Sequence, residues 1–155
     1  YKKTKILDAG CGTGLIAEAL AILNYKNIVG IDFSKGMLAV AKKRKLYKFL
    51  KKVDLTKKIP FSSNIFGTTL CFGVITKGHL GSEILDELIR VTKKGGFLIF
   101  TATQPVYNTL KFRNKISLLQ KKKIISKVEI TNTFFAMNKV KNSLVAKAYV
   151  YKILR

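Results

Sequence analysis

The chain has 155 residues, 48% of them hydrophobic and only two of them proline, which suits one folded domain and excludes a disordered or collagen-like chain. It contains no recognisable signal peptide and no apolar run of the roughly 18–20 residues that a membrane-spanning helix needs. Thirty basic residues against eight acidic ones give a formal net charge of +22, a field that would attract RNA, DNA or anionic lipid.

Short apolar runs alternate with helical patterns along the chain, which is typical of a parallel sheet with helices on both faces. The predicted strands occupy residues 5–9, 27–31, 47–53, 68–74, 97–102, 124–134 and 144–153. The predicted helices occupy residues 15–23, 34 onwards, 82–91 and 107–121, and a glycine turn at 93–96 ends the third of them. Ser34 and Ser82 are candidate N-caps of the second and third helices.

A polar turn at residues 138–142 joins the last two predicted strands, and this short connection favours an antiparallel pair. The sequence therefore predicts an α/β fold over residues 1–155: a three-layer sandwich around a seven-stranded, mostly parallel sheet with an antiparallel last strand. No repeat or linker divides the chain, so a single domain is expected.

The most informative segment lies where the first strand turns into the first helix. Gly10, Gly12 and Gly14 alternate there, directly after Asp8. Open α/β sheets bind ligands at the carboxyl ends of their strands, and glycines allow a ligand to approach the backbone closely. The following helix also offers free N–H groups to an anionic ligand group. A tight turn without a ligand is the alternative interpretation.

Two further acids end the next two predicted strands. Asp32 follows the second strand, where an acid can accept hydrogen bonds from both hydroxyls of a ribose, and Asp54 follows the third. With Asp8, three of the eight acids of the chain thus lie at the tips of the first three strands. A solvated acid in a turn would explain each one alone, but a shared binding crevice explains all three.

The sequence from Asp8 to Gly14 resembles the first motif of class I S-adenosylmethionine-dependent methyltransferases, which have a seven-stranded Rossmann-like sheet. The dinucleotide dehydrogenases would instead have the spacing Gly-x-Gly-x-x-Gly. More narrowly, residues 15–38, the pair Asp54-Leu55 and residues 73–80 resemble the Williams–Beuren-region methyltransferase-like proteins.

The resemblance implies S-adenosyl-L-methionine as the cofactor and S-adenosyl-L-homocysteine as the product. Asp8 would bind the cofactor's amino group directly or through water. Asp32 would bind the ribose hydroxyls, and Asp54 would accept a hydrogen bond from the adenine amino group. For Phe33 and Met37, packing in the core is the alternative role. The implied cofactor-binding residues are Asp8, Gly10, Cys11, Gly12, Gly14, Asp32, Phe33, Met37, Asp54, Leu55 and Cys71.

The remaining chemistry of the chain is sparse. His79 is its one histidine and the candidate base near the methyl group, with a merely exposed or structural histidine as the alternative. Neither cysteine has the spacing of a metal ligand, so no metal site is expected. Both are interpreted as free thiols, which points to the cytoplasm, the nucleus or an organelle matrix.

The methyl acceptor is not readable from the sequence, and a small molecule or a protein is expected, with no membrane partner. The charge of +22 leaves an RNA methyltransferase open, although four arginines among scattered lysines also fit AT-biased coding. A cofactor-binding pseudoenzyme is a third possibility. Relatives commonly carry an acid where Gly67 follows Phe66, and they have amino-terminal lid helices for which this sequence shows no counterpart.

Overall fold

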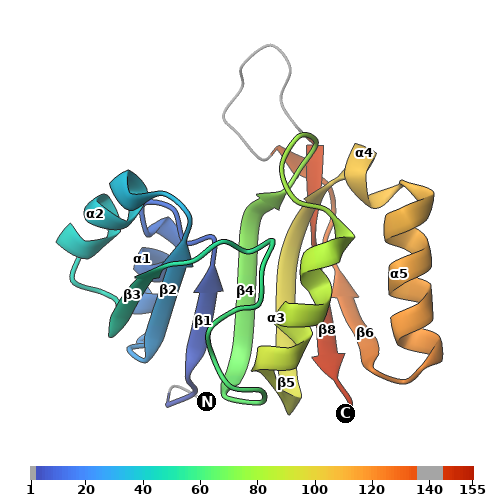
Figure 1. The fold of residues 1–155 in the computed structure, drawn as a ribbon, viewed down its shortest axis with the longest axis horizontal. Helices are drawn as coiled ribbons and strands as arrows, with labels where there is room; N and C mark the ends of the chain where they lie inside the picture. Colours follow the sequence, from blue (N-terminus) through green and yellow to red (C-terminus); the bar gives the residue numbers. More distant parts are fainter. Residues whose placement is uncertain (1–2, 136–144) are drawn as a thin grey trace.

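The computed structural model describes residues 3–135 and 145–155, and in it a mixed sheet has the strand order β3-β2-β1-β4-β5-β8-β6 (Figure 1). The strands on this path are β1 (Ile6–Ala9), β2 (Ile28–Asp32), β3 (Phe49–Lys52), β4 (Phe66–Ile75), β5 (Thr92–Thr103), β6 (Ile125–Ile130) and β8 (Val145–Ile153). The two-residue β7 (Phe134–Phe135) pairs with β8 off the path.

The five strands from β3 to β5 pair in parallel, and β8 is antiparallel to β5 and β6. This confirms the predicted fold class, a mostly parallel sheet of seven main strands with an antiparallel last strand. The helices are α1 (Leu15–Ile22), α2 (Lys35–Lys43), the 3-10 turn η1 (Ser82–Ile84), α3 (Leu85–Val91), α4 (Gln104–Tyr107) and α5 (Leu110–Lys121).

The helices form the two outer layers of the sandwich. In Figure 1, α3 and α5 lie in front of the sheet and α1 lies behind it. None of the described helices is long and apolar enough to cross a membrane. Ser34 caps α2 as predicted, because its hydroxyl oxygen accepts a hydrogen bond from the Met37 backbone N–H at 3.2 Å.

Ser82 does not cap the third predicted helix, which differs from the expectation. Ser82 is itself the first residue of η1, and its side chain is buried. Instead, the Glu83 carboxylate accepts the backbone N–H of Gly81 at 2.7 Å. A longer acidic side chain can bond the residue two positions before it, so the anionic group rather than the hydroxyl satisfies this N–H.

The predicted turn at 93–96 lies inside β5 as an irregularity of its pairing with β4. The register moves from Phe66↔Thr92 to Thr68↔Phe97, so the four residues between Thr92 and Phe97 loop out of the ladder. The predicted basic helix at 107–121 corresponds to α5, which begins at Leu110; a separate short helix, α4, precedes it. Thr109 caps α5 by accepting from the Phe112 N–H. The predicted turn at 138–142 lies outside the described residues.

An aromatic column joins the antiparallel part of the sheet to the helices in front of it. Phe100 of β5 stacks between Tyr149 and Tyr151 of β8, with ring centroids 5.3 and 5.9 Å away. Tyr107 of α4 stacks on Tyr149 at 4.1 Å, and Phe112 of α5 lies 6.0 Å from Phe100. Because Phe100 is fully buried and its ring lies against rings of β8 and α5, it joins these two elements to β5 in the carboxyl-terminal half of the core.

Replacing Phe100 by alanine should lower the free energy of unfolding by about 3–5 kcal/mol, because it leaves a cavity at the centre of this column. Phe33→Ala is the matched control, because 65% of the Phe33 side chain is exposed and its loss should cost under about 1 kcal/mol. Urea unfolding followed by circular dichroism measures both values. Equal losses for the two variants would contradict the assignment of Phe100 to the core.

Candidate functional site

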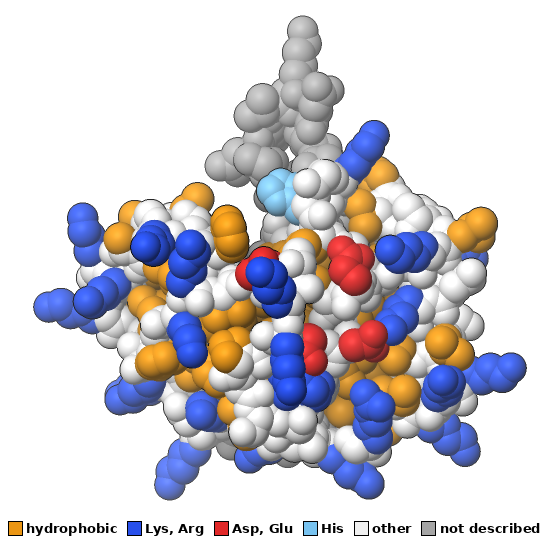
Figure 2. All heavy atoms as spheres, in the orientation of Figure 1, with side chains coloured by type: hydrophobic (Ala, Val, Ile, Leu, Met, Phe, Trp, Pro, Cys, Tyr) orange, Lys and Arg blue, Asp and Glu red, His pale blue; other side chains and the backbone are white. Residues whose placement is uncertain are grey.

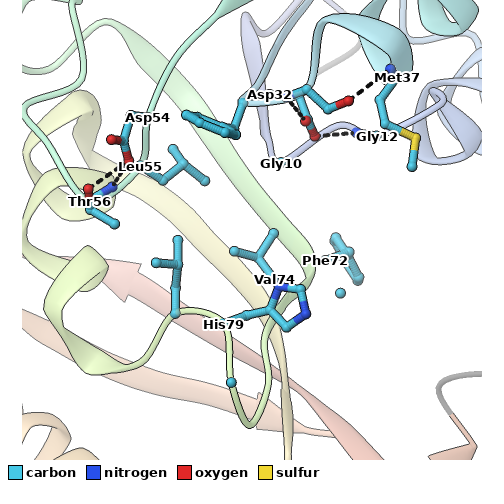
Figure 3. Close-up of a pocket in the computed structure, with 15 residues that line it drawn as sticks. Gly10, Gly12, Asp32, Met37, Asp54, Leu55, Thr56, Phe72, Val74 and His79 are labelled. Atoms are coloured by element: carbon cyan, nitrogen blue, oxygen red, sulfur yellow. Dashed lines mark hydrogen bonds between the residues drawn. The ribbon is translucent and has the colours of Figure 1, made fainter.

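A cleft opens at the carboxyl ends of β1 to β4, where the strand order reverses between β1 and β4 (Figure 3). Open α/β sheets bind their ligands at this reversal. The cleft has a volume of about 760 Å³, and its walls come from four successive strand ends. Its lining residues are Gly10, Gly12, Asp32, Phe33, Ser34, Met37, Asp54, Leu55, Thr56, Phe72, Gly73, Val74, Gly78, His79 and Leu80.

All three glycines of the first turn have a positive φ, at +78° for Gly10, +52° for Gly12 and +89° for Gly14. Their surroundings differ, however. A Cβ on Gly10 would overlap the Val74 side chain, and one on Gly14 would lie 3.0 Å from Arg44 Cδ, whereas one on Gly12 would meet nothing within 4 Å. Protein neighbours therefore require two of these glycines, and the third leaves its backbone open to the cleft.

The carboxylate of Asp32 ties the glycine turn to the end of β2. Its Oδ2 accepts the backbone N–H of Gly12, and its Oδ1 accepts that of Ser34, both at 2.8 Å (Figure 3). Each carboxylate oxygen retains a further lone pair. Because Asp32 is only half-buried and lines the cleft, these lone pairs remain available to a ligand.

Asp8 lies beneath the turn with only 1% of its surface exposed. Burial is the main effect that raises the pKa of Asp8 to about 6; the Tyr47 hydrogen bond opposes it and the negative charge of Asp32 adds to it. The Tyr47 hydroxyl donates to Asp8 Oδ2 at 2.7 Å, while Oδ1 is buried and has no hydrogen-bond partner among the described residues. A buried acceptor without a hydrogen-bond donor destabilises the folded protein. The free Oδ1 therefore fits a ligand that supplies a donor group.

Arg44, at the end of α2, holds the same turn from its outer side. Its Nε donates to the Thr13 carbonyl at 2.6 Å, and its guanidinium forms an ion pair with Glu18 of α1. Neither Arg44 nor Tyr47 was expected from the sequence. The signal that could have found Tyr47 is Gly30, a glycine inside a buried strand, which marks a close approach by another group.

The far wall of the cleft follows β3. Asp54 Oδ1 accepts both the backbone N–H and the hydroxyl of Thr56, and these hydrogen bonds, with Lys57 nearby, lower the pKa of Asp54. Phe33 and Met37 are 65% and 46% exposed and line the cleft, so the alternative of core packing is wrong for both. Lys52 Nζ lies 5.0 Å from the centre of the Phe33 ring.

Seven of the eleven cofactor-binding residues expected from the sequence line the cleft: Gly10, Gly12, Asp32, Phe33, Met37, Asp54 and Leu55. The other four, Asp8, Cys11, Gly14 and Cys71, lie behind its surface. Both cysteines are free and buried, and burial raises their pKa, to about 12 for Cys11. Cys71 points into the core, so the next residues of β4, Phe72 to Val74, form this wall.

His79 lines the cleft opposite Asp32, on the loop after β4, and its side chain is exposed (Figure 3). Sequence reasoning gave no place in the binding site to four of the lining residues: Ser34, Thr56, Gly78 and Leu80. Gly67 lies at the other end of β4 and not in the cleft, and a Cβ there would approach Thr4 Cγ2 to 2.8 Å. The absence of an acid at position 67 therefore changes contacts at the amino end of the strands and leaves the cleft walls unaltered.

A Rossmann-like sheet with a glycine turn and an acid after β2 defines the class of nucleotide-type cofactor-binding α/β domains. Within this class, residues 7–100 match the family model described as "Methyltransferase domain", and the chain belongs to this family. That match covers more than half of the chain.

Two curated relatives and one solved structure illustrate the relationship. The chain is 35% identical over 97 residues to human methyltransferase-like protein 27, covering 62% of this chain and 39% of the relative. It is 30% identical over 148 residues to the malonyl-[acyl-carrier protein] O-methyltransferase of Buchnera aphidicola, covering 83% and 59%. The chain thus spans about two-fifths to three-fifths of these relatives, and the first agrees with the narrower resemblance noted in the sequence.

A solved S-adenosylmethionine-dependent methyltransferase from Methanosarcina mazei has the same fold. Its TM-score to this chain is 0.73 at 16% sequence identity, with coverage of 100% of this chain and 95% of the solved one. At this identity the likeness concerns the fold.

The raised pKa of Asp8 predicts a dependence of stability on pH. The folded chain keeps a proton on Asp8 that the unfolded chain releases between about pH 4 and pH 6, so the contribution of Asp8 to stability falls as the pH rises through this window. A shift of about two units corresponds to about 3 kcal/mol. Asp8→Asn cannot ionise, so its stability relative to the wild type should rise by about this amount from pH 4 to pH 7.5.

Urea unfolding at several pH values measures this difference. Thr103→Val is the matched control, because Thr103 is equally buried and its hydroxyl also has no hydrogen-bond partner among the described residues, but its side chain does not ionise. Its stability relative to the wild type should be the same at pH 4 and pH 7.5. A pH-independent difference for Asp8→Asn as well would mean that Asp8 ionises as readily as in the unfolded chain.

Proposed function

We propose that the cleft binds S-adenosyl-L-methionine and that the protein transfers its methyl group to a small-molecule or protein acceptor. The observation that carries this proposal is the Asp32 carboxylate, which lines the cleft beside the open backbone of Gly12. Two further points support it: family membership, and the buried Oδ1 of Asp8, which has no hydrogen-bond partner among the described residues. Both fit a ligand with ribose hydroxyls and an amino group.

Each part of the cleft would hold a different part of the cofactor. The free lone pairs of Asp32 would accept the ribose hydroxyls, and Asp8 would attract the amino group from below the turn. Asp54 stays ionised because hydrogen bonds lower its pKa, and it would accept the adenine amino group beside the apolar side chains of Leu55 and Met37. When bound, the cofactor supplies a methyl group activated on a sulfonium, which needs no metal.

The acceptor would enter from the side of the cleft formed by β4 and the loop after it. Val74 and Leu80 would exclude water there, and His79 is the group available to remove a proton from the acceptor. A second hollow of about 240 Å³, which shares Gly78, His79 and Leu80 with the cleft, extends toward α5 and would give the acceptor room. The buried free thiols fit a reducing compartment such as the cytoplasm.

A second candidate function, methyl transfer to RNA, is favoured by the net charge of +22. Figure 2 shows the lysine and arginine side chains spread over the face in view, with acidic side chains among them, and no single basic groove. RNA binding that falls steeply with salt, together with methyl incorporation into RNA, would favour this candidate. Cofactor binding without turnover on any acceptor would favour a pseudoenzyme instead.

Calorimetric titration of the chain with S-adenosylmethionine, S-adenosylhomocysteine and NAD tests the proposed cofactor. We expect micromolar binding of the first two and none of NAD. Asp32→Ala should weaken binding of S-adenosylmethionine by about 3 kcal/mol, or about a hundredfold, because two charge-assisted hydrogen bonds to the ribose are lost.

Asp86→Ala is the control for this variant, because Asp86 is an exposed acid on α3 that pairs with Lys115 and does not line the cleft. It should bind S-adenosylmethionine as the wild type does. A change of less than about threefold for Asp32→Ala, with circular dichroism showing an intact fold, would refute the assignment of Asp32 to the ribose.

A further inference from the structure

Tyr47 forms a hydrogen bond with the buried carboxyl group of Asp8, although it belongs to none of the sequence motifs described above. It lies between α2 and β3, and it does not line the cleft. Its hydroxyl donates to Asp8 Oδ2 at 2.7 Å, whereas Oδ1 accepts no hydrogen bond from the described residues. One acceptor of Asp8 is thereby committed, and the other is held open in a fixed orientation.

Two glycines make room for the Tyr47 ring. Gly30 lies opposite Asp8 in the pairing of β1 with β2, and a Cβ on Gly30 would lie 2.7 Å from Tyr47 Cε1. A Cβ on Gly14 would lie 3.1 Å from Tyr47 Cε2 and 3.4 Å from the hydroxyl oxygen. The ring thus fills a slot between the second strand and the glycine turn, and neither wall of the slot tolerates a side chain without movement.

Four ionisable groups face Asp8: Tyr47, Cys11 of the turn, Asp32 of β2 and Cys71 of β4. Burial raises the pKa of both thiols, so they stay protonated at neutral pH, and the negative charge of Asp32 opposes ionisation of Asp8. Among these four, Tyr47 is the group that stabilises the Asp8 carboxylate, because its hydroxyl donates to it.

We propose that Tyr47 is a positioning residue for the cofactor, which holds the Asp8 carboxylate in its charged form with Oδ1 directed away from the tyrosine and free for the cofactor's amino group. This inference rests on the proposed function, since it requires S-adenosylmethionine in the cleft. Tyr47 acts through Asp8, without touching the ligand.

Tyr47→Phe removes the hydroxyl and keeps the ring that fills the slot. S-adenosylmethionine is titrated calorimetrically into the wild type and the variant from pH 5.5 to pH 8.5, and the ratio of the two Kd values is taken at each pH. This ratio cancels any titration of the ligand or of other groups in the cleft. Loss of the charge-assisted hydrogen bond should raise the pKa of Asp8 by about one unit. The variant should therefore bind about five- to tenfold more weakly at pH 6 and within about twofold of the wild type at pH 8.5.

Two controls separate this role from a purely structural one. Tyr25→Phe should leave the affinity unchanged at every pH, because the Tyr25 hydroxyl makes no hydrogen bond to a described residue and lies away from the cleft. In an Asp8→Asn background, Tyr47→Phe should lose its dependence on pH, because the group through which it acts no longer ionises. A Tyr47→Phe effect of equal size at all pH values would overturn the proposal.

The Asp8 carboxyl carbon, followed by NMR in the free chain, gives a readout that does not depend on binding. The pH midpoint of its chemical-shift titration should rise by about one unit in Tyr47→Phe. In the wild type alone, the Tyr47 Cζ resonance should titrate with the same midpoint as Asp8. If the wild type binds the cofactor but the titration midpoint of Asp8 is the same in Tyr47→Phe, the proposed role of Tyr47 is refuted and the proposed function stands. If the wild type binds no S-adenosylmethionine, the proposed function fails and this inference fails with it.

Discussion

The burial of one carboxyl group, that of Asp8, is the constraint around which the glycine turn is built. A buried carboxylate is costly unless it is hydrogen-bonded, and Asp8 sits at the end of a central strand with 1% of its surface exposed. Tyr47 supplies the hydrogen bond, and it can do so only because Gly30 and Gly14 leave space for its ring. The ring in turn packs beneath the turn whose backbone forms one wall of the cleft.

The three acids at the strand tips occupy three different environments and are suited to three different tasks. Asp8 is buried, and its pKa is raised to about 6; Asp54 is held by the hydrogen bonds of Thr56, and its pKa is lowered. Asp32 is half-buried, and both of its oxygens accept backbone N–H groups. Environment thus separates groups of identical chemistry, so that a mildly acidic solution protonates Asp8 before it protonates Asp54.

The sequence was sufficient to predict the fold class and the location of the cleft, because these depend on local patterns. Alternating apolar runs predict the strands, and glycines or acids at strand ends predict where a ligand approaches. Asp32 and Gly12 could therefore be found without a structure. What failed depended on the direction of a side chain or on a tertiary contact. Cys71 follows Leu70 in an apolar run, and only the packing of β4 reveals that it points into the core.

Tyr47 is a second case in which a tertiary contact could not be predicted from the sequence. It was assigned to the third strand, but β3 begins at Phe49, and the Tyr47 hydroxyl bonds Asp8 of β1. Gly10 and Gly14 were correctly identified as requiring the absence of a side chain, but the ligand is not the main reason. Val74, Arg44 and Tyr47 occupy the space, and all three come from distant parts of the chain. Contacts of this kind leave no local trace except an isolated glycine such as Gly30.

The strand order places β3 and β6 at the two borders of the sheet, and both borders carry lysine. In β3, Lys51 and Lys52 are exposed, and Lys127 is exposed in β6. Unpaired border strands are templates for aggregation, and charged side chains along them keep a second molecule from adding its own strand. The lysines at these borders therefore help to keep the protein from aggregating, whether or not the protein has a partner. Salt that screens these charges would bring the borders of neighbouring molecules within reach of each other.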